Sequence, residues 1–419
     1  MSRSTCVVGL GYVGLPLAVA LVEAGVPVTG YDTDAARISA LRAGVSGVGD
    51  VPDAVLGAAL GSGLRLSVTI SEAADAASYI ICVPTPLRGG MPDLSAVEAA
   101  ARAIGEVLRP GDLVVLESTT YPGTTEEVVA PLLDSGSGLV AGRDYLLAYS
   151  PERIDPGNPV WGIRNTPKVV GGLDAASTKA AVAFYEQVCE RVVEVGGTRE
   201  AEMAKLLENT FRHVNIALVN EMAVFCHELD IDLWAVIDAA ATKPFGFLPF
   251  FPGPGVGGHC IPVDPSYLSW RVRQKGFAFR FVELAQEINA AMPSYVVTRL
   301  ADLLNEHGLA LSRSSVLCLG AAYKPGVPDC RESPALEVMR QLRRKGATVA
   351  YSDPFVPFLT LEDEQLTSQP IDGDALTAYD AVVLLTAHDT FDLPLISTVL
   401  PLLLDTRGAA PAGAQVHRL

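Results

Sequence analysis

The stretch VVGLGYVGLPLA, residues 7–18, decides how the chain is interpreted, because it joins an apolar strand pattern to a glycine-rich turn. In the spacing Gly9-x-Gly11-x-x-Gly14, the first glycine permits a tight bend and the second lets a pyrophosphate approach the backbone. The third allows a helix to pack closely on the strand, so that the helix N-terminus faces the phosphates. We therefore expect a dinucleotide site whose contacts in this turn are Gly9, Gly11, Tyr12, Val13 and Gly14.

Asp32 ends the second strand pattern, VTGYD, about 20 residues after the turn, where an acidic residue binds the ribose 2′-hydroxyl. A carboxylate there repels a 2′-phosphate, which favours NAD over NADP. Arg37 keeps NADP open as the alternative, and it is a further candidate contact. Thr85 and Thr119 follow later strand patterns, at the sheet edge where ligands bind, and are predicted to contact the cofactor; ordinary turn formation is the alternative for each.

Short apolar runs alternate with alanine-rich amphipathic segments on both sides of two long helical patterns. This alternation predicts an α/β protein, with two Rossmann-like doubly wound domains joined by a helical central dimerisation domain. The second long helix is expected to be interrupted at Pro293. The predicted boundaries are a cofactor domain at 1–197, a helical domain at 198–308, a second Rossmann-like domain at 309–411 and a flexible tail at 412–419.

Composition excludes several classes of partner. The formal net charge of −17 argues against nucleic acid and anionic membranes, though not against a small anionic ligand. The seven cysteines are scattered without C-x-x-C spacing, which predicts reduced thiols and no metal site. No apolar run reaches the roughly 18 residues of a membrane span, and no signal-peptide pattern is present. We expect a cytoplasmic protein.

A second glycine-rich run, PGPGVGGHCIPVDP at residues 252–265, contains Cys260, and its glycines are expected to leave clearance for a ligand. A cysteine there is either an inert buried side chain or a nucleophile, and a nucleophile needs nearby cations or amides that favour the thiolate. Lys205 and Asn209 are spaced i, i+4 on the preceding long helix and supply such groups. The alternative for this polar stripe is an ordinary solvated helix face.

Six segments in a fixed order carry a resemblance to a known family. They are VVGLGYVGLPLA, ESTTYPGTT, SPERIDPGN, KLLENTFRHVNIALVNE, PGVGGHCIPVDP and AYKPGVPDCRESPALEVM, and together the chain resembles the UDP-glucose/GDP-mannose dehydrogenases over residues 3–408. The resemblance implies an NAD-binding domain, a dimerising helical middle and a C-terminal UDP-sugar-binding domain. It also implies oxidation of a sugar C6 alcohol to a carboxylate, with two NAD and no metal.

The resemblance assigns Cys260 as the nucleophile that captures the aldehyde as a thiohemiacetal and then carries a thioester. Lys205 and Asn209 would stabilise the oxyanion on the C6 oxygen. Asp264 would orient a water or Lys205, Glu152 would act in acid–base chemistry, and Thr119 would help hold the water. His259 resembles a cofactor contact, with a backbone-bonded loop histidine as the alternative.

The resemblance also supplies the predicted substrate contacts. Arg331 would reach the NAD, although Arg331 and Lys324 are both open to an alternative as surface ion-pair residues. The branch acting on 2-acetamido sugars is the more similar one, with UDP-glucose as the alternative substrate. A two-electron hydroxyacid dehydrogenase and a catalytically silent binder are the competing functions. The predicted substrate contacts are Glu152, Arg153, Lys205, Asn209, Arg212, His213, Asn215, Phe250, Phe251, Gly253, Gly257 and Lys324.

Overall fold

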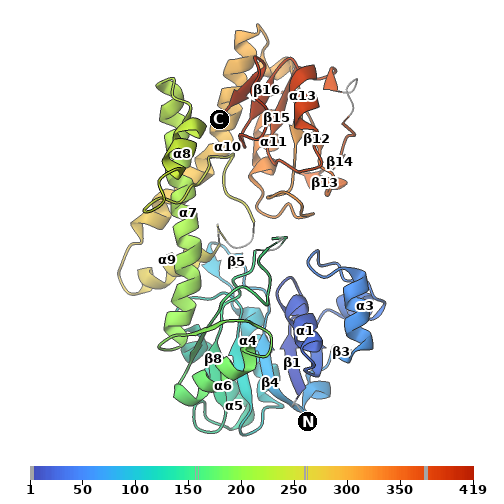
Figure 1. The fold of residues 1–419 in the computed structure, drawn as a ribbon, viewed down its shortest axis with the longest axis vertical. Coiled ribbons are helices and arrows are strands. Elements are labelled where there is room, and N and C mark those ends of the chain that lie inside the picture. The colour runs from blue at the N-terminus through green and yellow to red at the C-terminus, as the bar shows by residue number, and fades with distance from the viewer. Residues whose placement is uncertain (1–3, 156, 159, 259–260, 262, 372–375) are drawn as a thin grey trace. The chain divides into compact units, whose positions relative to one another are not determined.

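The computed structural model describes residues 4–155, 157–158, 160–258, 261, 263–371 and 376–419 (Figure 1). It divides into two compact units, Met1–Glu208 with Ser266–Phe277, and Asn209–Pro265 with Ala278–Leu419. We call them unit 1 and unit 2. The predicted helical middle is shared between these units, so its boundaries as a separate domain stay a prediction.

Unit 1 is built on an eight-stranded sheet in the order β10-β9-β8-β7-β4-β1-β2-β3. All neighbouring strands pair in parallel except β8 and β9. β7 and β9 are buried along their whole length, because helices cover both faces of this largely parallel sheet. The strands are β1 (Ser4–Val8), β2 (Val28–Tyr31), β3 (Leu64–Ser67), β4 (Ala76–Ile81), β7 (Leu113–Leu116), β8 (Leu146–Tyr149), β9 (Lys168–Gly172) and β10 (Val192–Glu194).

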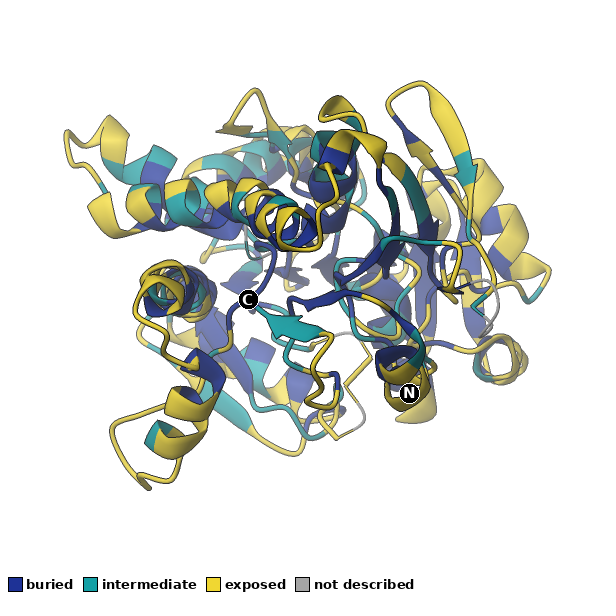
Figure 2. Ribbon diagram, turned by 90° about the horizontal axis from the view of Figure 1, so that it is seen from above, coloured by how far each residue is buried: buried dark blue, intermediate teal, exposed yellow. Residues whose placement is uncertain are grey.

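The helices of unit 1 pack on this sheet and form two apolar cores, one on each face. Figure 2 shows the buried colour concentrated on interior strands and the inward sides of helices, while the outer sides of the helices are exposed. These helices are α1 (Gly14–Glu23), α2 (Ala35–Arg42), α3 (Asp53–Gly61), α4 (Ser95–Gly105), α5 (Ala130–Ser137) and α6 (Ala175–Tyr185). A short hairpin of β5 (Leu87–Arg88) and β6 (Met91–Pro92) and a π-helical turn at Thr125–Val129 complete the unit.

Unit 2 contains a five-stranded parallel sheet in the order β12-β11-β15-β16-β17. The predicted second Rossmann-like sheet is therefore confirmed. Its strands are β11 (Ser315–Leu319), β12 (Thr348–Ser352), β15 (Ala381–Leu384), β16 (Leu403–Asp405) and β17 (Val416–Arg418), with a separate hairpin of β13 (Phe358–Leu361) and β14 (Glu364–Thr367). Its helices are α8 (Leu233–Ala241), α10 (Arg280–Glu306), α11 (Pro334–Arg344) and α13 (Leu393–Val399), while α7 (Thr198–Glu228) and α9 (Asp264–Gln274) belong partly to each unit.

The predicted interruption at Pro293 is wrong, because α10 continues through this residue. Proline lacks an N–H, so the carbonyl one turn earlier, at Asn289, loses its usual helical donor. A Cβ at Gly255 would lie 3.1 Å from that Asn289 oxygen. The loop backbone therefore packs against the part of the helix that proline leaves unpaired.

The predicted flexible tail is also wrong. Val416–Arg418 forms β17 and pairs in parallel with β16. The side chain of Leu419 is buried in the apolar core of the unit, and its carbonyl accepts a hydrogen bond of 3.3 Å from Trp234 Nε1. The sequence does not predict this strand, because the segment before it is rich in alanine and proline and only the last few residues make the strand and core contacts.

Candidate functional site

The turn between β1 and α1 has the geometry that its three glycines predict. Gly9 has a φ of +91°, and a Cβ there would lie 2.8 Å from the Cys82 carbonyl oxygen. A Cβ at Gly14 would lie only 1.9 Å from the Gly9 oxygen, so α1 approaches the strand as closely as a helix without side chains allows. No described atom lies within 4 Å of a Cβ placed on Gly11. Gly11 is thus the glycine whose backbone is left open to a ligand.

Asp32 lies at this turn, as predicted. Its carboxylate accepts a hydrogen bond of 2.9 Å from Leu10 N, so the acidic residue and the glycine turn form one structure. Arg37 Nη1 donates to Leu10 O at 3.2 Å, and its Nε lies 3.9 Å from Asp32 Oδ2. Arg37 is therefore held beside the carboxylate that would repel a 2′-phosphate. Tyr12, the exposed residue of the turn, is 45% accessible.

The two threonines differ in their surroundings. Thr85 is buried, and its carbonyl accepts a hydrogen bond of 2.9 Å from Tyr267 Oη. Thr119 is half-buried at the end of β7. The next residue, Thr120, is fully buried, and its hydroxyl has no hydrogen-bond partner among the described residues. Sequence reasoning selected Thr119 and missed Thr120, because adjacent threonines in a turn look alike until their burial is known.

Unit 1 contains a group of buried charges, which we call the Lys168 cluster: Glu117, Glu152, Lys168 and Tyr185. Lys168 Nζ lies 3.1 Å from Glu117 Oε1 and 3.2 Å from Glu152 Oε2. Tyr185 Oη donates to Glu117 Oε1 at 2.5 Å. Burial raises the pKa of Glu117 despite Lys168, whereas Lys168, the Ile154 N–H and Lys205 overcome burial and lower the pKa of Glu152. Of these four residues the sequence analysis selected only Glu152. Glu117 and Lys168 lie at the ends of buried strands, and charged residues at such positions are the signal that could have found the cluster.

Lys205 and Asn209 lie one turn apart on α7, and both are buried. The alternative of a solvated helix face is therefore wrong for these two residues. In unit 2, Asn209 Nδ2 donates to Asp264 Oδ2 at 2.5 Å, which fixes the amide by the carboxylate at the start of α9. Arg153, the residue after Glu152, pairs with Glu208 at 2.6 Å and donates to Pro167 O.

His213 ends a chain of hydrogen bonds in unit 2. Gly253 N donates to Asn220 Oδ1, Asn220 Nδ2 donates to Asn289 Oδ1, and Asn289 Nδ2 lies 3.5 Å from His213 Nδ1. The amide donor makes Nδ1 the acceptor, so Nε2 carries the proton in the neutral ring. Burial lowers the pKa of His213 to about 4. The imidazole is therefore neutral at physiological pH, with an N–H donor at Nε2.

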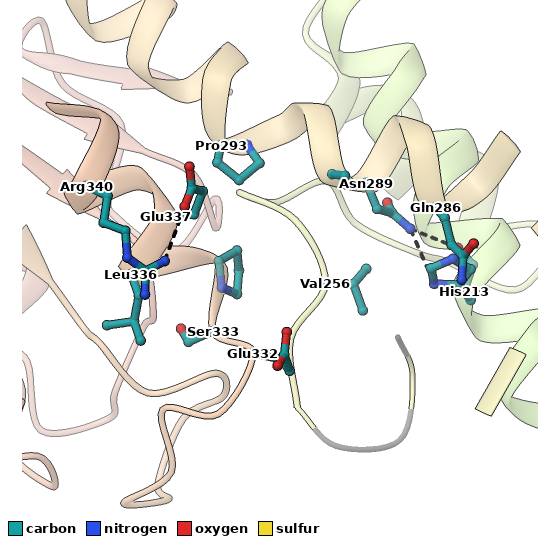
Figure 3. A pocket seen from close by; sticks show the side chains of 12 residues that line it. His213, Val256, Gln286, Asn289, Pro293, Glu332, Ser333, Leu336, Glu337 and Arg340 are labelled. Atoms are coloured by element: carbon teal, nitrogen blue, oxygen red, sulfur yellow. Dashed lines mark hydrogen bonds and ion pairs between the residues drawn. The ribbon is translucent and has the colours of Figure 1, made fainter. Parts of the chain in front are cut away.

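Nε2 of His213 has no partner among the described residues, although His213 is only 2% exposed. The residue lines a cavity of about 470 Å³ that lies within unit 2. Figure 3 shows Asn289 and Gln286 beside His213, with Val256 of the loop nearby and Arg340 and Glu337 on the opposite wall. The cavity thus combines an unsatisfied buried donor with apolar and charged walls.

The glycine-rich loop is close-packed, which corrects part of its interpretation as clearance for a ligand. A Cβ at Gly257 would lie 2.8 Å from Glu332 O, and one at Gly258 would lie 2.7 Å from the Tyr323 ring. A Cβ at Gly253 would lie 2.9 Å from Nη1 of Arg407, a half-buried cation that sequence reasoning missed. Each of these glycines therefore has a packing reason, and substrate contact by Gly253 and Gly257 stays a prediction.

The two phenylalanines before this loop have different surroundings. Phe250 packs edge-on against Phe211, with ring centroids 5.6 Å apart, in the small core of α7 and α8. Phe251 stacks on Trp234 at 5.5 Å but is 46% exposed. Phe250 thus has a packing role, while Phe251 retains a free face.

The remaining predicted residues lie on the surface or outside the described chain. Arg212 is exposed on α7, and Asn215 Nδ2 donates to the Phe211 carbonyl. Arg331 is exposed and pairs with Asp329 at 2.6 Å, as its ion-pair alternative has it. Lys324 is half-buried in the loop after β11. The predicted roles of His259 and Cys260 fall on residues that lie outside the described ones.

A Rossmann-type sheet with an open glycine turn and a second nucleotide-type sheet place the protein in the class of NAD-dependent α/β dehydrogenases. Three family models match the chain in order: the NAD binding domain of the UDP-glucose/GDP-mannose dehydrogenase family at residues 3–189, its central domain at 199–291 and its UDP binding domain at 317–410. The chain belongs to the UDP-glucose/GDP-mannose dehydrogenase family. It is a nucleotide-sugar dehydrogenase with NAD as its cofactor, as predicted.

Similar proteins cover nearly the whole chain. UDP-N-acetyl-D-glucosamine 6-dehydrogenase of Pseudomonas aeruginosa is 36% identical over 389 residues, covering 92% of this chain and 90% of that protein. UDP-N-acetyl-D-mannosamine dehydrogenase of Pyrococcus horikoshii is 36% identical over 352 residues, covering 84% and 83%. A solved structure of the UDP-D-ManNAc dehydrogenase from Pyrococcus horikoshii has a TM-score of 0.89 at 33% identity, covering 99% of this chain and 98% of that one.

A solved UDP-glucose dehydrogenase from Pyrobaculum islandicum has a TM-score of 0.86 at 30% identity, covering 97% of this chain and 94% of that one. Both substrate branches are therefore structurally similar to this chain. Among the described residues, no helix has the length and apolar character needed to cross a bilayer.

Proposed function

We propose that this enzyme oxidises the C6 hydroxyl of a UDP-N-acetylhexosamine to a carboxylate in two NAD-dependent steps. The observation that carries the proposal is the buried pair on α7, Lys205 and Asn209, with Asn209 fixed by Asp264 at 2.5 Å. Buried, pre-oriented donors of this kind stabilise an oxygen that becomes negative during a reaction. The relatives that share almost the whole chain with it act on UDP-N-acetylglucosamine and UDP-N-acetylmannosamine.

The residues at the β1–α1 turn fit NAD. The open face at Gly11 leaves room for the pyrophosphate, and Asp32 is held at the same turn for the ribose hydroxyls. Arg37 is engaged with Asp32 and Leu10, which supports NAD rather than NADP. When bound, NAD supplies the hydride acceptor. Tyr12, Val13, Thr85, Thr119, His259 and Arg331 are the further proposed contacts.

The chain's own residues would carry the remaining chemistry. Loss of a hydride from C6 and of the hydroxyl proton gives the aldehyde, while Lys205 and Asn209 stabilise the oxyanion. The Cys260 thiol adds to the aldehyde to form a thiohemiacetal, and a second hydride loss leaves a thioester. Water then releases the carboxylate and restores the thiol, with Glu152 and Asp264 as the carboxylates that accept and position protons. The thiohemiacetal is needed because a free aldehyde lacks the tetrahedral carbon from which a second hydride leaves.

His213 supports a 2-acetamido sugar over glucose. Its buried Nε2–H has no acceptor among the described residues, which costs about 1–3 kcal/mol unless a ligand or water accepts the bond. An acetamido carbonyl is such an acceptor, and its methyl group suits the apolar wall at Val256. His213 also lies one helical turn beyond Asn209, which is a suitable interval between two groups that contact the same sugar ring.

The test is NADH formation and product analysis with UDP-N-acetylglucosamine, UDP-N-acetylmannosamine and UDP-glucose. The proposal expects a uronate from an acetamido sugar, with a kcat/KM above that for UDP-glucose. A higher kcat/KM for UDP-glucose would assign the other branch. One NADH per turnover with a hydroxyacid, and none with any UDP-sugar, would support the two-electron alternative instead.

We also propose a homodimer through α7. Exposed apolar side chains recur along this helix and at the residue after it at intervals near 3.5 residues, the spacing of a helix–helix contact: Leu207, Phe211, Leu218, Phe225 and Leu229, which are 46–62% exposed. Phe225→Glu should lower the mass measured by light scattering from that of a dimer to that of a monomer; a wild-type monomer would contradict the proposal. The six described cysteines are all free, which supports a reducing, cytoplasmic setting.

A further inference from the structure

The Lys168 cluster is a group of buried charges in unit 1, and the proposed reaction gives a role to only one of its members, Glu152. Its members come from four neighbouring elements: Glu117 follows β7, Glu152 follows β8, Lys168 begins β9 and Tyr185 ends α6. β7, β8 and β9 are adjacent in the sheet. The side chains of Lys168 and Glu117 are 7% and 0% exposed, and that of Glu152 is 15% exposed.

One ammonium group serves both carboxylates. Nζ of Lys168 lies 3.1 Å from Glu117 Oε1 and 3.2 Å from Glu152 Oε2. Since both oxygens contact the same nitrogen, the two carboxylates lie close together. Two carboxylates so close in a buried setting cannot both stay ionised without the cation between them. Lys168 is therefore the group on which the charge state of the pair depends.

The two carboxylates are held differently. Glu152 Oε1 accepts hydrogen bonds from the backbone N–H groups of Arg153 at 2.6 Å and Ile154 at 2.7 Å, and only Oε2 faces Lys168. Glu117 instead accepts the Tyr185 hydroxyl at 2.5 Å and has the Cys82 thiol 3.8 Å away. The Lys168 ammonium group thus contacts Glu117, which Tyr185 holds in place, and it also contacts Glu152, the carboxylate with the proposed role in proton transfer.

We propose that Lys168, anchored by Glu117 and Tyr185, is a positioning residue that keeps the Glu152 carboxylate ionised and in one orientation during the oxidation. The inference rests on the proposed function, because it is there that Glu152 receives a role. Lys168 itself touches no reacting atom; it acts only through Glu152. A purely structural clamp between β7, β8 and β9 is the competing explanation.

The charges around Glu152 predict how its pKa changes when Lys168 is removed. Lys168 and Lys205 favour its ionised form, and Glu117 opposes it. Removing Lys168 leaves the repulsion from Glu117 and the burial, so the pKa of Glu152 rises and its carboxylate protonates at higher pH. The titratable groups coupled to this cluster are Glu117, Glu152, Lys168, Lys205, Tyr185, Cys82 and Cys189.

The test compares Lys168→Met with Lys168→Arg by the pH dependence of kcat/KM for uronate formation. In Lys168→Met the acid limb should move to higher pH by about one to three pH units, the effect of an opposite charge at this distance. Lys168→Arg keeps the charge and should stay near wild type. An unmoved acid limb in Lys168→Met, together with a lowered melting temperature, would identify the structural clamp and overturn the proposal.

A second comparison avoids a folding failure caused by two buried carboxylates without a cation. Glu117→Gln removes one of these charges, so the double variant Glu117→Gln/Lys168→Met does not leave two unpaired carboxylates in the interior. The double variant should have its acid limb at higher pH than Glu117→Gln alone; equal profiles would refute the role of Lys168.

An infrared titration of the protonated carboxyl band, assigned with Glu152→Gln, gives the same comparison without turnover. A wild-type enzyme that makes no uronate would contradict the proposed function. Glu152 titration that is identical with and without Lys168 would contradict this inference independently.

Discussion

His213 gives a stability prediction whose magnitude follows from its burial. Its pKa is lowered from 6.5 to about 4, because the 2% exposed ring loses hydration when charged. The unfolded chain therefore binds a proton near pH 6.5, while the folded chain resists it until about pH 4. This contribution to stability is fully present above pH 6.5 and is lost as the pH falls. At about 1.4 kcal/mol per pH unit, about 3 kcal/mol should be lost between pH 7 and pH 4.

The assay is urea unfolding of unit 2, followed by the fluorescence of Trp234, which stacks on Phe251. Replacing Trp161 and Trp270 by phenylalanine leaves Trp234 as the only tryptophan of the three in the chain. His213→Gln removes the titrating group and should flatten the pH dependence by about 3 kcal/mol over this range.

Asn289→Ala is the matched control, because it removes the amide beside Nδ1 but keeps the imidazole. It should lower the free energy of unfolding by about 1 kcal/mol and retain the pH dependence. If His213→Gln and wild type lose stability in parallel between pH 7 and pH 4, the folded chain does not resist protonation of His213, and its pKa is not lowered by burial.

Three further predictions follow from the packing of the turn and the tail. Gly11→Ala should leave the melting temperature nearly unchanged but weaken NAD binding at least tenfold, because the backbone there is open to a ligand. Gly14→Ala places a Cβ 1.9 Å from Gly9 O and should destabilise unit 1 by more than about 2 kcal/mol. Calorimetry and NAD titration compare the two variants, and equal effects on stability would contradict these separate roles. Asp32→Asn should weaken NAD binding about tenfold and narrow its preference over NADP, because the charged partner of the ribose is lost; unchanged NAD affinity would count against Asp32 as a contact. Removal of residues 416–419 should cost unit 2 about 1.5–3 kcal/mol through the loss of Leu419 burial alone, measured by urea unfolding, and an unchanged midpoint would mean that β17 is not part of the stable fold.

The sequence was sufficient for the parts of the fold that depend on local patterns. The glycine turn, Asp32 after β2 and the two largely parallel sheets follow from the period of apolar residues and from spacing, and all three are found. Pro293 and the tail show where local signals mislead. Tertiary packing keeps α10 helical through a proline, and two or three apolar residues suffice to add an edge strand.

The candidate site was only partly predictable, for a physical reason. A polar stripe on a helix has the same sequence pattern whether it is solvated or buried, so Lys205 and Arg212 cannot be distinguished until the packing is known. Lys168 and Glu117 lie far apart in the sequence and meet only because β7, β8 and β9 are neighbours. The loop glycines were read as clearance for a ligand, but close packing against Tyr323 and Glu332 is a second cause that the sequence alone does not reveal.

A four-electron oxidation through a covalent intermediate on Cys260 is tested most directly by the ratio of NADH to uronate formed from a UDP-N-acetylhexosamine. The wild type should form two NADH for each uronate. Cys260→Ser should form uronate far more slowly than the wild type, or not at all, while it still binds NAD. Normal uronate formation by Cys260→Ser, or one NADH per sugar with the aldehyde as the final product of the wild type, would contradict this mechanism.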